Sequence, residues 1–109
     1  MFEDLYDTIS RLWSRRWPEA MGEVTSVAVE RIGTSPRDKG RLALAVAYKF
    51  SVKGEGPYTG ESFWSPAFRF SRAVLAARRN IRVGHPVLVR YRPDDPSVNT
   101  LDRRVWQHL

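Results

Sequence analysis

The chain has 109 residues, enough for one domain with a single modest core, and its 42% hydrophobic content with four Trp, four Tyr and five Phe indicates a folded protein. It contains no cysteine, which excludes disulfides, thiolate nucleophiles and cysteine-based zinc sites. No apolar run approaches the ~20 residues that span a bilayer, and the start of the chain lacks the basic flank and apolar run of a signal peptide. These features predict a cytoplasmic protein.

The net charge of +6 comes entirely from the last third of the chain. Residues 69–109 carry nine arginines and three aspartates, whereas residues 1–68 carry nine basic and nine acidic side chains. This asymmetry is typical of a protein with a polyanionic or membrane-surface partner, and a merely solvated basic face would give the same pattern. The sequence leaves both interpretations open.

Residues 1–17 are predicted to form an N-terminal amphipathic helix in front of a β-barrel-like domain at 18–109. Apolar side chains recur there at helical spacing, and proline at position 18 is expected to end the helix. Such a stripe can cover the fold's own sheet, or bind a partner protein or a second copy of the chain as a homodimer. Because the first turn is acidic, we expect one of these rather than peripheral membrane contact, which is the alternative. The partner-binding stripe comprises Phe2, Leu5, Tyr6, Ile9, Leu12 and Trp13.

Three strands are predicted next. Every even position from Leu42 to Val52 is large and apolar, so this strand buries one face and leaves the other wet or lightly covered. A strand from about residue 22 to 32 precedes it, and its apolar side chains change face near Thr25–Ser26, which predicts a β-bulge. A third strand at 58–63 follows a turn at 53–57.

The remaining elements are a short helix at about 71–80, a strand at 87–92 and a last strand or extension at about 98–106. The helix is expected to bury Val74, Ala77 and Ile81. This order predicts a mainly β (α+β) fold, a small five-stranded antiparallel barrel or rolled sheet with a short helix between strands 3 and 4. Its core is expected to contain Leu44, Val46, Tyr48, Phe50, Val87, Val89 and Tyr91.

Framework residues between Trp17 and Leu101 resemble a bacterial family known as domain of unknown function 3592. The similarity rests on turn glycines, prolines and strand aromatics, so it implies a fold and no catalytic group. Members of that family often carry transmembrane helices beside the domain, where this chain has its predicted amphipathic helix. The matching residues are Trp17-Pro18, Gly22, Val24, Tyr48, Phe50, Val52, Gly54, Tyr58, Gly60, Gly84, Val87, Val89, Tyr91-Arg92-Pro93, Pro96 and Leu101.

No group of side chains has the spacing of a catalytic or metal site. His85 and His108 lack the spacing of a helical metal pair. Asp94 and Asp95, with nearby oxygen ligands at Asn99 and Asp102, lack the glycine and terminal glutamate of a calcium-binding loop. We therefore expect no enzymatic activity, no metal and no cofactor.

A non-catalytic protein-interaction module is the function that the sequence predicts. The alternative is an OB-like nucleic-acid-binding domain, in which aromatic side chains stack on bases and arginines neutralise phosphates. The same aromatics could instead close one end of the barrel. The possible polyanion-binding residues are Trp64, Phe68, Arg69, Arg72, Arg79 and Arg82.

Overall fold

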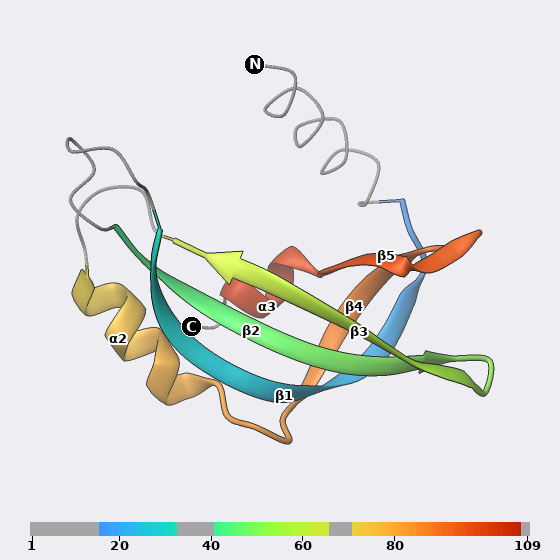
Figure 1. Ribbon diagram of the computed structural model, residues 1–109, viewed down its shortest axis with the longest axis horizontal. Helices are drawn as coiled ribbons and strands as arrows, with labels where there is room; N and C mark the ends of the chain where they lie inside the picture. The colour runs from blue at the N-terminus through green and yellow to red at the C-terminus, as the bar shows by residue number, and fades with distance from the viewer. Residues whose placement is uncertain (1–15, 33–40, 66–70, 108–109) are drawn as a thin grey trace, which may run out of the picture.

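A computed structural model describes residues 16–32, 41–65 and 71–107, and the fold is drawn in Figure 1. Two β-hairpin connections join the first three strands, and one helix separates them from the last two. The predicted order of strands and the predicted helix between strands 3 and 4 are confirmed. The elements are β1 (Glu19–Ile32), β2 (Arg41–Val52), β3 (Glu55–Trp64), α2 (Ser71–Asn80), β4 (Pro86–Arg92), β5 (Asp95–Leu101) and α3 (Arg103–Gln107).

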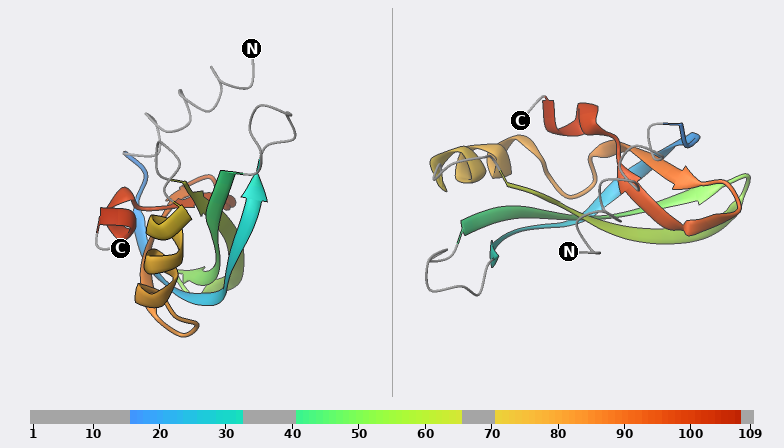
Figure 2. Two further views of the ribbon diagram at one scale, coloured as in Figure 1. Left: turned by 90° about the vertical axis from the view of Figure 1, so that its left-hand side faces the viewer. Right: turned by 90° about the horizontal axis from the view of Figure 1, so that it is seen from above.

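The strands form one antiparallel sheet in the order β3-β2-β1-β4-β5. The first four make a Greek key, because β4 returns by a long connection to lie beside β1. The sheet curls into a nearly closed barrel, and Figure 2 shows α2 and α3 on the same side of the curved β1–β2–β3 sheet. The predicted five-stranded antiparallel architecture is therefore confirmed.

Side chains, rather than a backbone ladder, join the two edge strands β3 and β5. The Tyr48 hydroxyl donates to Asn99 Oδ1 at 2.7 Å, and Asn99 Nδ2 donates to the carbonyl of Thr59 at 3.2 Å. Further along the seam, the amide of Leu101 donates to Ser62 Oγ at 3.2 Å. Asn99 therefore connects the interior of the barrel to both of its edges.

The core lies between the inward faces of the strands and α2. Six of the seven predicted core residues are almost fully buried. Tyr91 is only half-buried, and it stacks on Phe50 with 6.1 Å between ring centroids. The ladder between β1 and β2 shifts register between Val24 and Ser26, which confirms the predicted bulge.

The outward face of β2 differs from the prediction in its first half. Ala43 and Ala45 are buried, with 0% and 5% exposure, whereas Lys49 is exposed as expected. Alanine side chains are short, so longer cross-strand neighbours such as Glu30 and Phe63 rise above them on the pleated surface. Periodicity alone does not reveal this shielding.

Element boundaries also differ from the prediction. β1 begins at Glu19 and β3 at Glu55, each three residues early, because ladders to β4 and β2 extend them. Arg16 and Trp17 form a turn and bend rather than the end of a helix, since the residue before Pro18 is kept out of the α region. The rest of the predicted N-terminal helix lies outside the described residues.

The last predicted segment, 98–106, proved to be two elements. β5 ends at Leu101, and after Asp102 the five residues of Arg103–Gln107 form the short helix α3, whose Trp106 stacks on Trp64. The ring centroids are 6.4 Å apart with 13° between the planes. Both indoles pack against the core at the end of the barrel, as in the alternative that assigned the aromatics to barrel closure.

Replacing Trp106 with alanine should lower the free energy of unfolding by about 1.5 kcal/mol. An aromatic pair contributes about 0.5–1.5 kcal/mol beyond its buried area, and both rings are half-buried. Urea denaturation measures the change. Phe63→Ala is the matched control: this ring neighbours Trp64 on β3 but is 50% exposed, so its loss should cost under about 0.5 kcal/mol. Equal effects of the two substitutions would contradict a structural role for the stack.

Candidate functional site

The most distinctive surface of the molecule is the outer side of α2. Val74 and Ala77, with Ile81 just after the helix, are at most 5% exposed and pack against the core. At about 100° per residue, the opposite side of the helix presents Arg72, Leu75, Ala76 and Arg79, all exposed. We call these four residues, with the exposed flanking arginines Arg78 and Arg82, the arginine face.

The arginines of the arginine face form no ion pair with another described residue. No acidic residue occurs between Glu61 and Asp94 in the sequence. Within the described residues, the arginines that form ion pairs are Arg90, Arg92 and Arg104, and none of them belongs to this face. Exposed Leu75 (48%) and, beyond the helix, Val83 (64%) add apolar surface to the positive charge.

The structure places the sequence-predicted site residues in separate surroundings. Arg72, Arg79 and Arg82 lie together on the exposed side of α2 and its end, as predicted. Trp64 packs against Trp106 and the core instead of standing free beside them. Phe68 and Arg69 lie outside the described residues. So does the whole predicted partner-binding stripe: Phe2, Leu5, Tyr6, Ile9, Leu12 and Trp13.

A second charged cluster is internally paired, and the sequence interpretation did not find it. The Asp102 carboxylate, 4% exposed, accepts hydrogen bonds from Arg90 Nε at 2.7 Å and from Arg104 Nε at 2.8 Å. Glu19 pairs with both arginines, at 2.8 Å and 2.6 Å. Arg90 Nη1 also donates to the carbonyl of Trp17 at 2.7 Å. The cluster therefore ties the start of β1 to β4 and α3.

The ion pairs set the ionisation of this cluster. The hydrogen bonds from the Arg104 side chain, assisted by its backbone amide and by Arg90, hold the pKa of Asp102 far below its ordinary 3.8, although burial acts in the opposite direction. Hydrogen bonds to Asp102 and then to Glu19 raise the pKa of Arg104 above its ordinary 12.5. Both shifts favour the charged forms of Asp102 and Arg104 at neutral pH.

The other residues considered for metal binding are also committed elsewhere. Asn99 Oδ1 accepts from Tyr48, and Asp94 pairs with Arg92 at 2.8 Å. Among the residues that the structure describes, no three His, Asp or Glu side chains come together in a way that could hold a metal ion. Burial raises the pKa of Tyr48 above 10.0, which keeps this interior hydroxyl protonated as the donor to Asn99.

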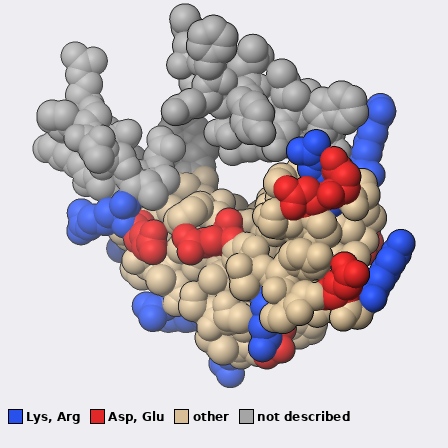
Figure 3. Space-filling model, turned by 45° about the vertical axis from the view of Figure 1, so that its right-hand side comes forward, with Lys and Arg blue, Asp and Glu red and all other residues tan. Residues whose placement is uncertain are grey.

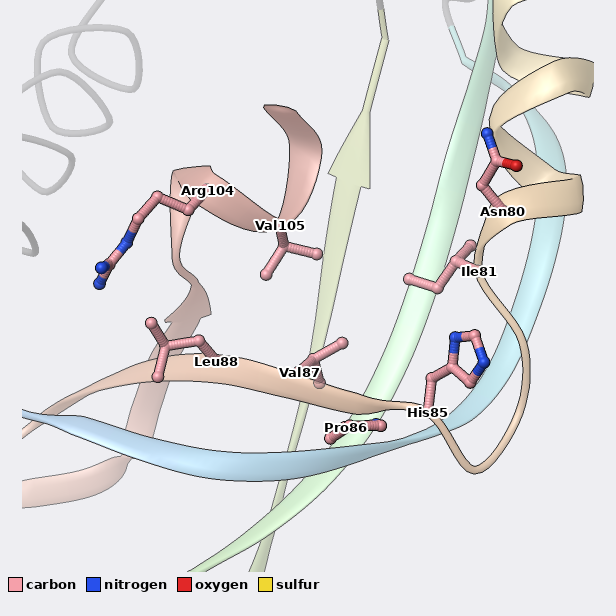
Figure 4. A pocket seen from close by; sticks show the side chains of 8 residues that line it. All are labelled: Asn80, Ile81, His85, Pro86, Val87, Leu88, Arg104 and Val105. Atoms are coloured by element: carbon pink, nitrogen blue, oxygen red, sulfur yellow. The ribbon is translucent and has the colours of Figure 1, made fainter. Parts of the chain in front are cut away.

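Two open hollows mark the surface near the turn that contains Gly84. The first, about 290 Å³, has an apolar floor where Ile81, Val87 and Val105 approach one another, while Arg104 points away from it (Figure 4). Exposed His85 stands at its edge. The second, about 650 Å³, is lined in part by Met21 and Pro86. Neither brings together the convergent polar groups that fix a small ligand.

The outward face of β2 and β3, where OB-type barrels bind oligonucleotides, offers little to a nucleic acid here. Along β2 the face carries the buried Ala43 and Ala45, then Ala47 and the exposed Lys49, and along β3 Glu61 adds negative charge. Phe63 is its one exposed aromatic ring in the described strands. Figure 3 shows acidic and basic side chains interspersed over one side of the molecule, rather than a single positive channel.

A family model for a domain of unknown function, DUF3592, matches residues 20–106, which cover the described strands and helices except for the first residue of β1 and the last residue of α3. The chain belongs to the DUF3592 family. The matched range agrees with the resemblance drawn from framework residues 17–101. Comparison with curated proteins found no match, and neither did comparison with solved structures. DUF3592 membership thus supports the framework and assigns no activity, so functional arguments rest on the surface of this chain.

None of the helices in the described ranges has the length and hydropathy needed to cross a membrane.

Proposed function

We propose that this chain is a non-catalytic interaction module that docks an acidic protein surface through the arginine face of α2. The observation that carries the proposal is the exposure of four arginines on one short helix and its end, none of them in an ion pair with another described residue, beside an exposed leucine. Arginine is enriched in protein interfaces, because its planar guanidinium forms paired hydrogen bonds with carboxylates.

The composition of the face favours a protein over a nucleic acid. Leu75 and Val83 offer apolar contact that a phosphate backbone cannot use, but that carboxylate-bearing protein surfaces commonly match. Sequence-tolerant binding of single-stranded nucleic acid uses aromatic faces for base stacking, and Trp64 is already stacked on Trp106. Nucleic-acid binding is therefore the less favoured alternative, and the binding test below includes a DNA probe to detect it.

The rest of the molecule supports a scaffold role. The barrel interior is filled by large side chains such as Leu44, Tyr48 and Phe50. The buried carboxylate of Asp102 is bound by two arginines and caps α3, so it serves the fold. A filled barrel that holds a short basic helix rigidly against its side is suited to presenting that helix to a partner.

Fluorescence anisotropy with three labelled probes tests the proposal. The probes are a 15-residue amphipathic peptide of Glu and Leu, the same peptide with Lys for Glu, and a 20-nucleotide single-stranded DNA. At low salt the Glu peptide should bind and the Lys peptide should not, because only the former complements the arginines. Arg72→Glu with Arg79→Glu should weaken binding of the Glu peptide at least ~10-fold, about 1.4 kcal/mol.

The matched control is Arg31→Glu with Arg103→Glu, which changes the net charge equally at two exposed arginines outside the arginine face. Binding should survive this change nearly intact. Failure of the Glu peptide to bind would contradict the proposal. Tight binding of the DNA, lost on reversing Arg72 and Arg79, would replace it with the nucleic-acid alternative.

A further inference from the structure

We infer that the acidic surface recognised by the arginine face is the N-terminal segment of a second copy of this chain. The inference rests on the proposed function, and it names the partner. The segment carries three acids within its first seven residues, Glu3, Asp4 and Asp7, beside the apolar stripe that begins at Phe2. The segment thus combines negative charge with apolar side chains, whereas the arginine face combines positive charge with apolar side chains.

Charged side chains recur along both segments, within two helical turns on α2 and within about one turn in the predicted N-terminal helix. Arg72 and Arg79 are seven residues apart, which places them about 10 Å apart along α2 with Leu75 between them. In the predicted N-terminal helix, Glu3 and Asp7 are one turn apart, with Leu5 and Tyr6 between them in the sequence. Two such helices can cross with apolar side chains in contact and opposite charges on the flanks.

The point where the N-terminal segment joins the barrel lies far from α2 of the same chain (Figure 1). Arg90 holds this point through the Trp17 carbonyl at 2.7 Å and through Glu19 at 2.8 Å. Figure 1 shows the start of β1 at the opposite end of the molecule from α2. β1 has 14 residues, so it covers up to ~45 Å, comparable with the 44 Å long dimension of the molecule.

The predicted helix is too short to return over that distance. The acids precede Trp17 by 10 to 14 residues, which is only ~15–20 Å of α-helix. A second copy is not limited in this way. If each copy offers its segment to the other, the same contact forms twice about a two-fold axis, which closes the assembly as a dimer.

Sedimentation equilibrium of the full chain and of charge-reversed variants tests the inference. The wild type should have a mass of about 25 kDa, twice the 12.6 kDa of one chain. Arg72→Glu with Arg79→Glu should return it to the monomer mass, and so should Glu3→Arg with Asp7→Arg. The control pair, Arg31→Glu with Arg103→Glu, should remain dimeric.

Mixing the two monomeric variants in equal amounts should restore the 25 kDa species. Each contact of the mixed dimer again joins opposite charges: one is native and the other is reversed on both sides. A chain that carries all four reversals should also dimerise. That result would show that the two doubly substituted variants are monomeric because of charge repulsion and not because they fail to fold. Contact between a segment and its own α2 would leave the mixture monomeric.

Three results would overturn the inference: a monomeric wild type, a dimer indifferent to both reversed pairs, or a mixture that stays at 12.6 kDa. The Glu peptide separates this failure from failure of the proposed function. If the wild type is monomeric but still binds the Glu peptide through Arg72 and Arg79, the proposed function is retained and the partner is a different protein. If the wild type is monomeric and the Glu peptide also fails to bind, both the inference and the proposed function are overturned.

Discussion

Asp102→Ala should lower the free energy of unfolding by about 3 kcal/mol, enough to reduce the melting temperature by more than ~10 °C. Asp102 is 4% exposed and binds Arg90, whose side chain is only 20% exposed. Its removal leaves a partly buried guanidinium short of one partner, and the desolvation of that charge is no longer offset. The carboxylate also accepts from the backbone amide of Arg104 at 2.9 Å, so α3 loses its N-terminal cap.

The effect of this substitution should depend on pH in one direction. The pKa of Asp102 is depressed in the folded state relative to its ordinary 3.8, so the carboxylate stabilises the fold above pH ~4–5. That stabilisation is lost as pH falls below 3.8 toward the folded-state pKa. The wild type and Asp102→Ala should therefore differ fully at neutral pH and converge in strong acid.

Chemical denaturation between pH 2 and 7 measures both statements. Asp94→Ala is the matched control: its pair with Arg92 is 51% and 65% exposed, so the loss should be under about 0.5 kcal/mol. The charged cluster does not hold β1, β4 and α3 together if Asp102→Ala lowers the free energy of unfolding as little as Asp94→Ala does. The same conclusion follows if the loss for Asp102→Ala grows as pH falls.

Gly60→Ala should cost about 3 kcal/mol, because the barrel seam passes directly over this glycine. A Cβ there would lie 2.5 Å from the Tyr48 hydroxyl and 2.6 Å from Tyr48 Cζ, and closer still to Asn99 Oδ1. Forcing atoms into a packed region typically costs about 1–3 kcal/mol, and separating Tyr48 from Asn99 adds about 1 kcal/mol for the buried hydrogen bond.

A double-mutant cycle with Asn99→Ala separates the steric clash at Gly60 from any other effect of the substitution on the stability of β3. Truncating Asn99 removes the nearest obstructing atom, so Gly60→Ala should cost at least ~1 kcal/mol less in that background. Thermal unfolding of the four variants gives the coupling. Additive costs would contradict the account in which Gly60 is small because the Tyr48–Asn99 bridge crosses it.

The parts of the fold that were predictable are those encoded within one segment. The alternation from Leu42 to Val52 fixed the inward face of β2, because side chains alternate along any strand. The change of face near Ser26 predicted the bulge, and helical spacing predicted that Val74 and Ala77 would be buried. These signals need no knowledge of what lies opposite.

Contacts between segments far apart in the chain were not predictable in the same way. Asp102 was considered only as an oxygen ligand, yet its partner Arg90 lies 12 residues away and Glu19 in the same cluster lies at the other end of the chain. Asn99 bonds Tyr48 across 51 residues. Only the closed barrel brings these side chains together.

The candidate site shows the same division. Exposure of Arg72 and Arg79 followed from the helical pattern, whereas the surroundings of Trp64 depended on α3, which was predicted as a strand or extension. Five residues with two adjacent arginines gave too short a pattern to identify that helix. The predicted partner-binding stripe from Phe2 to Trp13 lies outside the described residues and stays a prediction.

The central claim is that the arginine face of α2 is the docking surface. Its most direct test is a ¹H–¹⁵N NMR titration of the full 12.6 kDa chain with the unlabelled Glu and Leu peptide. We predict that the largest amide shift changes fall within 71–83, and that they disappear in the variant with Arg72→Glu and Arg79→Glu. Shift changes centred on the outward face of β2 and β3, or none at all within 71–83, would contradict the claim.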